Sequence, residues 1–142
     1  MEYIQHIRKT ELARNTSQII RRVQRGQTVL VENHGQAEAA ILDILDYHIL
    51  RAVTSFYSRP PKINPQGLSL KEVHDIASQQ EKYDLVLAYY LSDAISLGHA
   101  AELLDLPSLD LQTRFMRLDV PPHLGPEDKA DADAEVDAAR QF

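Results

Sequence analysis

The spacing of apolar and polar residues changes several times within the first fifty residues, and it predicts a small mixed unit of strands and helices. Residues 3–7 alternate well enough for a short strand. Apolar residues then recur at helical spacing as far as Arg25, and two short apolar runs, 29–31 and 37–42, flank the turn Asn33-His-Gly-Gln. The predicted order is therefore strand, helix and β-hairpin.

The helix that ends near Arg25 is predicted to be amphipathic. One stripe, at positions i, i+3, i+4 and i+7, is expected to be buried, while basic and amide side chains follow helical spacing on another face. Thr10 is expected to cap a short helical turn before this helix, and Gly26 to end it. The buried stripe comprises Thr16, Ile19, Ile20 and Val23, and the polar face comprises Arg14, Gln18, Arg21 and Arg25.

The hairpin is expected to lead directly into a third helix. Gly35 lies in the turn and is free to take the positive φ that a tight hairpin requires. Asp43 is expected to cap the helix that follows. The apolar side of that helix is expected to contain Leu45, Ile49, Ala52 or Val53, and Phe56, with Tyr47 and Tyr57 as additional members.

Residues 58–67 contain three prolines and a glycine, which predicts a stiff, extended linker between two domains. After it, Ser69 and Glu72 form a capping box, and Tyr83 and Tyr90 occupy the buried positions of a later helix, together with Val86 or Leu87. The helices expected in this half cover about 70–80, 82–92, 96–104 and 108–118.

The net charge of −6 conceals two opposed ends. Residues 1–30 contain six basic and two acidic side chains, a balance of +4, whereas residues 124–142 contain six acidic and two basic ones, a balance of −4. Different partners are therefore expected for the two ends. The acidic tail has low hydrophobicity and is expected to be disordered in isolation.

Several functional classes find no support in the sequence. The chain has no cysteine, no phosphate-binding glycine loop and no nucleophile elbow, so we expect neither an enzyme nor a cofactor. The N-terminus lacks the pattern of a signal peptide, and no apolar run approaches the roughly 18 residues of a membrane span, so a cytoplasmic protein without membrane contact is expected. The histidines are scattered and are expected to be surface or packing residues rather than metal ligands: His6, His34, His48, His74, His99 and His123.

Residues 11–26, Glu-Leu-Ala-Arg-Asn-Thr-Ser-Gln-Ile-Ile-Arg-Arg-Val-Gln-Arg-Gly, followed by the hairpin and the strand Ala39-Ala-Ile-Leu, resemble the N-terminal module of the Phd/YefM antitoxins. The resemblance covers roughly residues 1–55. It implies an intracellular antitoxin that dimerises through this module, binds its own operator and neutralises a toxin with the segment that follows. The DNA-binding residues expected on this basis and from the charge pattern are Arg8, Lys9, Arg14, Asn15, Arg21, Asn33 and His34.

A second resemblance covers about residues 80–120. The segments Tyr83-Asp-Leu-Val-Leu-Ala-Tyr-Tyr-Leu and Ile95-Ser-Leu-Gly-His-Ala-Ala-Glu-Leu-Leu are similar to a family of small prokaryotic proteins with an Ile-Ser-Leu-Gly-x-Ala-Ala-Glu-Leu motif, often regarded as antitoxins of PIN-type ribonucleases. Residues 96–118 also have helix-turn-helix character, with a turn at Asp105-Leu-Pro and a cap at Ser108. The last helix has little net charge, which favours partner binding over DNA reading.

We therefore predict an α+β antitoxin of a type II toxin-antitoxin system. It would act as a homodimer or higher oligomer, repress its own operon, and bind a cognate protein toxin, a ribonuclease, through residues within 70–142. The alternatives are a dimeric scaffold or adaptor without a DNA role, and a stand-alone transcriptional regulator without a toxin. The predicted parts are a DNA-binding and dimerisation module at 1–57, a linker at 58–67, a helical partner-binding region at 68–122 and an acidic flexible tail at 123–142.

Overall fold

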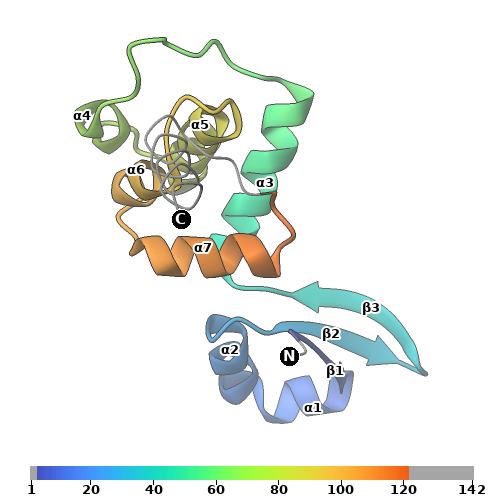
Figure 1. Cartoon of the computed structure of the whole chain (residues 1–142). Coiled ribbons are helices and arrows are strands. Elements are labelled where there is room, and N and C mark those ends of the chain that lie inside the picture. The colour runs from blue at the N-terminus through green and yellow to red at the C-terminus, as the bar shows by residue number, and fades with distance from the viewer. Residues whose placement is uncertain (1–2, 122–142) are drawn as a thin grey trace, which may run out of the picture. The chain divides into compact units, whose positions relative to one another are not determined.

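The chain folds as a mixed α+β protein, seen in a computed structural model that describes residues 3–121 (Figure 1). The described residues form two compact units, 3–47 and 48–121. The predicted acidic tail, 123–142, lies outside the described residues. Within them there are three strands and seven helices: β1 Ile4–Arg8, α1 Lys9–Arg14, α2 Thr16–Gln24, β2 Thr28–Asn33, β3 Gln36–Ile41, α3 Ile44–Ser58, α4 Leu70–His74, α5 Gln79–Leu91, α6 Leu97–Leu103 and α7 Ser108–Arg117.

The N-terminal unit contains a three-stranded sheet in the order β1-β2-β3. β1 and β2 are parallel, with Ile7 opposite Val31, and β2 and β3 are antiparallel. A parallel pair needs a crossover connection, which α1 and α2 supply here. The predicted order of strand, helix and hairpin is confirmed.

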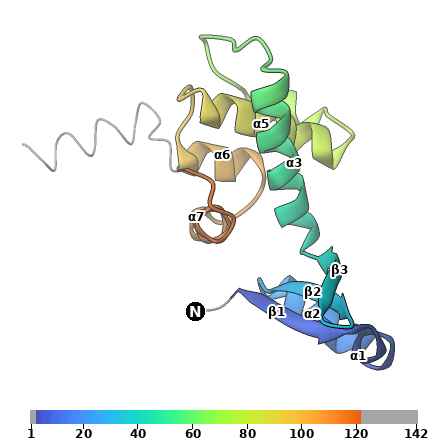
Figure 2. The ribbon, with the colours of Figure 1, turned by 90° about the vertical axis from the view of Figure 1, so that its right-hand side faces the viewer.

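The core of this unit lies between the sheet and the helices α1 and α2, which Figures 1 and 2 show on one side of the sheet. Leu12 of α1 and Ile41 of β3 are partly buried against it. For so short a unit this is a small apolar core, and small units commonly need a further source of stability. Its buried members are Ile7, Ile19, Val23, Val29 and Val31.

Two expectations for the first helices are wrong. Ile20 is 40% exposed whereas Ile19 is fully buried, because α2 has a single sheet face to cover and the pair Ile19 and Val23, four residues apart, is enough to cover it. Thr16 is exposed as well. Thr10 does not cap a helix: α1 begins at Lys9, directly after the extended Arg8, so Thr10 already lies inside the helix.

The turn of the hairpin has positive φ at both central residues, 54° at His34 and 78° at Gly35. Two successive residues of this kind are the signature of a type I′ turn, which matches the right-handed twist of the flanking strands. The prediction for Gly35 is therefore confirmed, and Gly26, with φ 108°, ends α2 as expected. His34 is a rarer occupant of this region, which strains most side chains that carry a Cβ atom.

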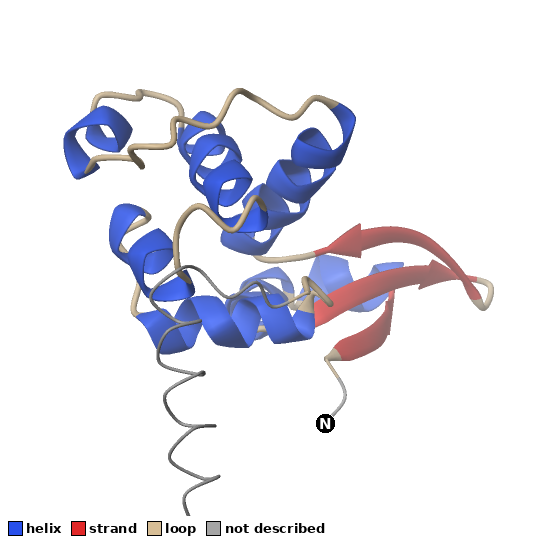
Figure 3. Ribbon diagram, turned by 45° about the horizontal axis from the view of Figure 1, so that its top comes forward, coloured by secondary structure: helices blue, strands red, loops and turns tan. Residues whose placement is uncertain are grey.

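The second unit is built around α5, and Figure 3 shows that this part of the chain is helical. From Val86 to Leu91 every residue of α5 is buried, and Tyr83 and Tyr90 are buried as predicted. A helix that is enclosed on all sides is the centre of a bundle. The Tyr90 ring packs against Phe115 of α7, with ring centroids 5.1 Å apart.

Serine side chains start three of the helices in this unit. Ser69 accepts a hydrogen bond from the Glu72 amide, as the predicted capping box requires, and Ser78 and Ser96 cap α5 and α6 in the same way. The predicted helix at 70–80 is too long, because α4 ends at His74 and the chain restarts a helix after Ser78. Ser108 is not a cap: Pro107 takes the extended position before α7, and Ser108 is the first helical residue.

The third helix contacts α5 through His48, whose ring lies 5.4 Å from that of Tyr83, centroid to centroid. Asp43 accepts a hydrogen bond from the Leu45 amide and caps α3 as predicted, and Ile49 and Ala52 are fully buried. Tyr47 and Tyr57 were expected on the apolar side of this helix, but they are 45% and 63% exposed. The helix is only half covered, so residues on its outer face remain in contact with water.

The boundary between the compact units falls at residues 47 and 48, inside α3 and before the proline-rich segment 58–67. The reason is that hydrogen bonds from a side chain of α5 connect this helix to α3. Gln80 donates one hydrogen bond of 2.9 Å to the His48 carbonyl and another of 2.9 Å to Asp84, while its own carbonyl oxygen lies 2.6 Å from His48 Nδ1. The proline-rich segment is held as well, since the Asn64 amide donates to the Tyr89 hydroxyl.

The first prediction concerns the small N-terminal core. Ile19→Ala removes buried methyl groups and leaves a cavity, so we expect it to lower the free energy of unfolding of the N-terminal unit by about 2–5 kcal/mol. Hydrogen exchange of the β2 amides measures this. Ile20→Ala, the matched neighbour at an exposed position, is expected to cost less than about 1 kcal/mol; equal losses for the two variants would contradict the described packing.

Candidate nucleic-acid interface

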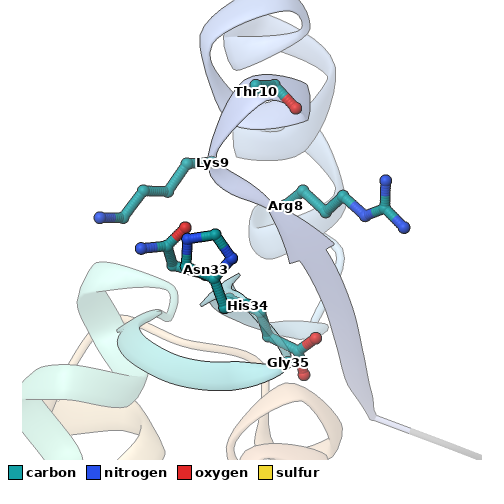
Figure 4. Close-up of a pocket in the computed structure, with 7 residues that line it drawn as sticks. Arg8, Lys9, Thr10, Asn33, His34 and Gly35 are labelled. Carbon is teal, nitrogen blue, oxygen red and sulfur yellow. The ribbon is translucent and has the colours of Figure 1, made fainter.

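A hollow of about 510 Å³ lies where the end of β1, the start of α1 and the hairpin tip meet. Figure 4 shows its lining: Lys9 and Arg8 extend to opposite sides of the chain, and Lys9 lies near the side chains of Asn33 and His34. We call it the hairpin hollow. It is lined by Arg8, Lys9, Thr10, Glu32, Asn33, His34 and Gly35.

The parallel pairing of β1 with β2 brings these residues together. It places Arg8 opposite Glu32, so the residue that ends β1 lies beside the residue that precedes Asn33. The chain then enters α1 at Lys9 without a loop. Two segments about 25 positions apart in the sequence therefore share one site, and four of the expected DNA-binding residues line it.

A carboxylate already engages two of these residues. Lys9 Nζ lies 2.5 Å from Glu38 Oε2, and the Asn33 side chain donates a hydrogen bond to the same carboxylate. The hydrogen bond from Lys9, followed by that from Asn33, lowers the pKa of Glu38 below its ordinary value. Glu38 is exposed and remains ionised at neutral pH, so it offsets the charge of Lys9.

Glu38 owes its position to an irregularity in β3. Val31 pairs with Ala39 and Glu32 pairs with Ala37, which leaves Glu38 as the extra residue of a β-bulge. A bulge interrupts the regular alternation of side chains along a strand and redirects one of them. β3 is also an edge strand whose residues 36–40 are all exposed, so nothing covers this carboxylate within its own unit.

The second carboxylate of the hairpin hollow is paired on the sheet. The Glu32 side chain forms an ion pair with His6 of β1 when His6 is protonated, and otherwise a hydrogen bond. The His6 side chain is more than half exposed. Both carboxylates at the hairpin are thus in contact with groups that carry or can carry a positive charge.

A second hollow, of about 400 Å³, lies at the junction of α1 and α2. The residues Arg14, Asn15 and Arg21 contribute to its lining, and each of them is exposed. No side chain caps the first turn of α2, and that turn contains no acidic residue. We call this the junction hollow; its full lining is Ala13, Arg14, Asn15, Thr16, Ser17, Gln18 and Arg21.

All seven expected DNA-binding residues therefore line one of two hollows on the N-terminal unit. Arg8, Lys9, Asn33 and His34 line the first, and the remaining three line the second. The structure adds Glu38, which sequence reasoning missed. In a single sequence, a glutamate in an alternating strand looks like any other solvent-exposed residue. The bulge that directs Glu38 towards Lys9 cannot be recognised from that sequence.

The last helix of the second unit presents a different surface. α6 and α7 contact each other across the turn at Asp105, which has φ 59°, but Arg114 Nε lies 3.3 Å from Asp110 within α7 itself. Two large apolar side chains of α7 are strongly exposed, Leu109 at 72% and Met116 at 71%. This face resembles a protein-binding surface more than a phosphate-binding one.

Other sites are absent from the part of the chain that the structure describes. No three side chains of the metal-binding types come together among residues 3–121. No helix in that range is both long enough and apolar enough to cross a bilayer. Comparison with known protein families, with curated proteins and with solved structures gave no match to this chain.

The second prediction tests the pairing of Glu38. Because its folded pKa is lowered, Glu38 contributes stability that is present above its unfolded pKa and is lost as the pH falls through its folded pKa. An NMR titration of the side-chain carboxyl should place the Glu38 pKa below the ordinary value of a glutamate. Lys9→Ala should move it upwards, and an unchanged value would show that Lys9 is not its partner.

Proposed function

We propose that this protein is an antitoxin that binds double-stranded DNA through its N-terminal unit and a protein toxin through its helical part. The observation that carries the DNA role is the grouping of all seven basic and polar candidates around two hollows at opposite ends of α1. The resemblance to the Phd/YefM module supports the same assignment. Operator binding and toxin neutralisation are inferred together from that resemblance.

The spacing of the hollows suits a nucleic-acid backbone. α1 has six residues and rises about 1.5 Å per residue, so its ends lie about 9 Å apart. Both hollows could therefore face one stretch of a duplex backbone, where basic side chains contact phosphates. Such contacts would supply affinity, while Asn15 and His34 offer side chains for base edges.

A homodimer would complete this unit. Its core contains five buried apolar side chains among the described residues, and Ile4 and Ile44 of the same unit are exposed. Burial of part of that apolar surface against a second copy would stabilise both units. Two copies related by a two-fold axis would then meet a palindromic operator.

The third prediction is a steep salt dependence of DNA binding. Fluorescence anisotropy with a duplex from the promoter of its own gene should detect binding at about 50 mM salt, with an affinity that falls sharply towards 200 mM. Arg14→Ala and Arg21→Ala should each weaken binding and reduce the slope of log K against log salt by about one per bound copy.

Arg51→Ala provides the matched control, because Arg51 is an exposed helical arginine outside both hollows. It should leave the affinity within about twofold. No binding by the unaltered protein at about 50 mM salt, or equal losses for all three arginines, would refute the proposed interface.

The toxin is expected to engage the helical part of the chain. The face of α7 with Leu109 and Met116 offers exposed apolar area, and the sequence that follows is strongly acidic. A ribonuclease must attract RNA phosphates, so its substrate path is basic and complementary to such a tail. A ribonuclease of the PIN type, which the second resemblance implies, would fit both features.

The fourth prediction separates these two contributions. The product of the neighbouring gene should co-purify with the full chain, and deletion of residues 125–142 should weaken that complex if the carboxylates bind the toxin. The combined variant Leu109→Ser and Met116→Ser should weaken it through α7. If only the deletion weakens the complex, the tail forms the interface. If only the serine variant weakens it, α7 forms the interface.

One observation favours a second candidate, a dimeric adaptor without a DNA role. The Lys9 ammonium is already paired with Glu38, so the hairpin hollow carries less free positive charge than its sequence indicates. The absence of a toxin gene next to this one, together with failure to bind the promoter duplex, would favour the adaptor. A promoter-binding protein without a neighbouring toxin would instead be a stand-alone regulator.

A further inference from the structure

Glu38 does not line the hairpin hollow, but its carboxylate binds two of the donors that do. Its carboxylate contacts the Lys9 ammonium and the Asn33 side-chain amide at the same time. An ammonium and an amide are donors without a preference for carboxylate, and a phosphate oxygen accepts hydrogen bonds from both groups equally well. The contacts that this site would make with a DNA backbone are therefore already made, within the protein, by one of its own side chains.

The geometry makes this contact easy to exchange. The side chain of Lys9 is 55% exposed and that of Glu38 is 42% exposed, so water reaches both ends of the pair. An ion pair at this exposure contributes little to stability and can open without disturbing the core. The bulge that redirects Glu38 lies on an exposed edge strand, where rotation of the side chain meets no packed neighbour.

The other groups of the hollow do not replace Glu38 in this role. Glu32 contacts His6 on the sheet, and Arg8 extends away from Lys9 (Figure 4). Lys9 and Asn33 are thus the two donors that Glu38 holds, and they come from α1 and from the hairpin tip. The sequence analysis had already predicted that both residues contact DNA.

We propose that Glu38 is a built-in competitor for DNA phosphate, which must displace its carboxylate from Lys9 and Asn33 before the hairpin hollow can engage the duplex. This inference rests on the proposed DNA-binding function. Glu38 lowers the affinity for any duplex and leaves the base-reading side chains unchanged. The affinities for specific and for non-specific DNA should therefore be lowered by the same factor.

The test is a double-mutant cycle on the full chain, with the promoter duplex and a mixed-sequence duplex of equal length as probes. Glu38→Gln keeps the size and a hydrogen-bond acceptor but removes the charge. It should tighten binding of both duplexes about two- to fivefold for each copy that engages DNA, the range expected for the loss of one exposed ion pair. Glu72→Gln, which removes an equal charge from the exposed surface of α4, should change the affinity by less than about twofold.

The cycle distinguishes competition from general repulsion. A competitor acts through Lys9, so most of the gain from Glu38→Gln should disappear in the Lys9→Ala background. Additive effects would overturn the proposal, because they would mean that Glu38 merely repels DNA at a distance. The Asn33 side-chain amide resonances should also shift when phosphate replaces the carboxylate, and their failure to move when the duplex is added would count against the exchange.

The possible failures are distinct. If the unaltered protein binds DNA and Glu38→Gln binds no more tightly, the competitor role is wrong and the proposed function stands. If neither protein binds at about 50 mM salt, both are wrong. Binding by Glu38→Gln alone would support the competitor role and would show that the free protein holds its own site closed. Hydrogen exchange of the β2 amides establishes that each variant is folded.

Discussion

The parallel pairing of β1 with β2 is the interaction on which the N-terminal unit depends. It sets Ile7 beside Val31 in the buried layer, and one residue later it sets Arg8 beside Glu32 at the rim. The same ladder therefore creates both the core and the hairpin hollow. A slip of one residue would turn Ile7 away from α2 and would separate Lys9 from the hairpin, so the apolar face that specifies the register also specifies the candidate site.

The charge of this unit is less available than its distribution along the chain indicates. Arg14 and Arg21 are exposed around the junction hollow, whereas Lys9 is held by Glu38. The two hollows thus differ in character although both are polar and lie at the ends of one short helix. Under the proposed function, the junction hollow would make the first phosphate contact, and the hairpin hollow would be the place where Glu38 lowers the affinity.

Local patterns in the sequence were sufficient for the elements and for most of the candidate site. The alternation in β1, the turn glycine Gly35 and the cap Ser69 each depend on a few neighbouring residues, so the sequence was enough to predict them. The exposure of Ile20, Tyr47 and Tyr57 depends on how much of each helix the rest of the unit covers, which is a tertiary property. The contact between Lys9 and Glu38 needs the parallel ladder, the hairpin and the bulge together, and no single window of the sequence contains all three.

The turn at His34 and Gly35 has a consequence for recognition. The turn has only two residues, and the strand pairing of Asn33 with Gln36 closes it directly, so its tip has few other conformations. The imidazole and the neighbouring amide are thus carried on a stiff arm, which would lose little conformational entropy on meeting a partner. A flexible loop with the same side chains would have to be ordered first, and its binding would be weaker for the same contacts.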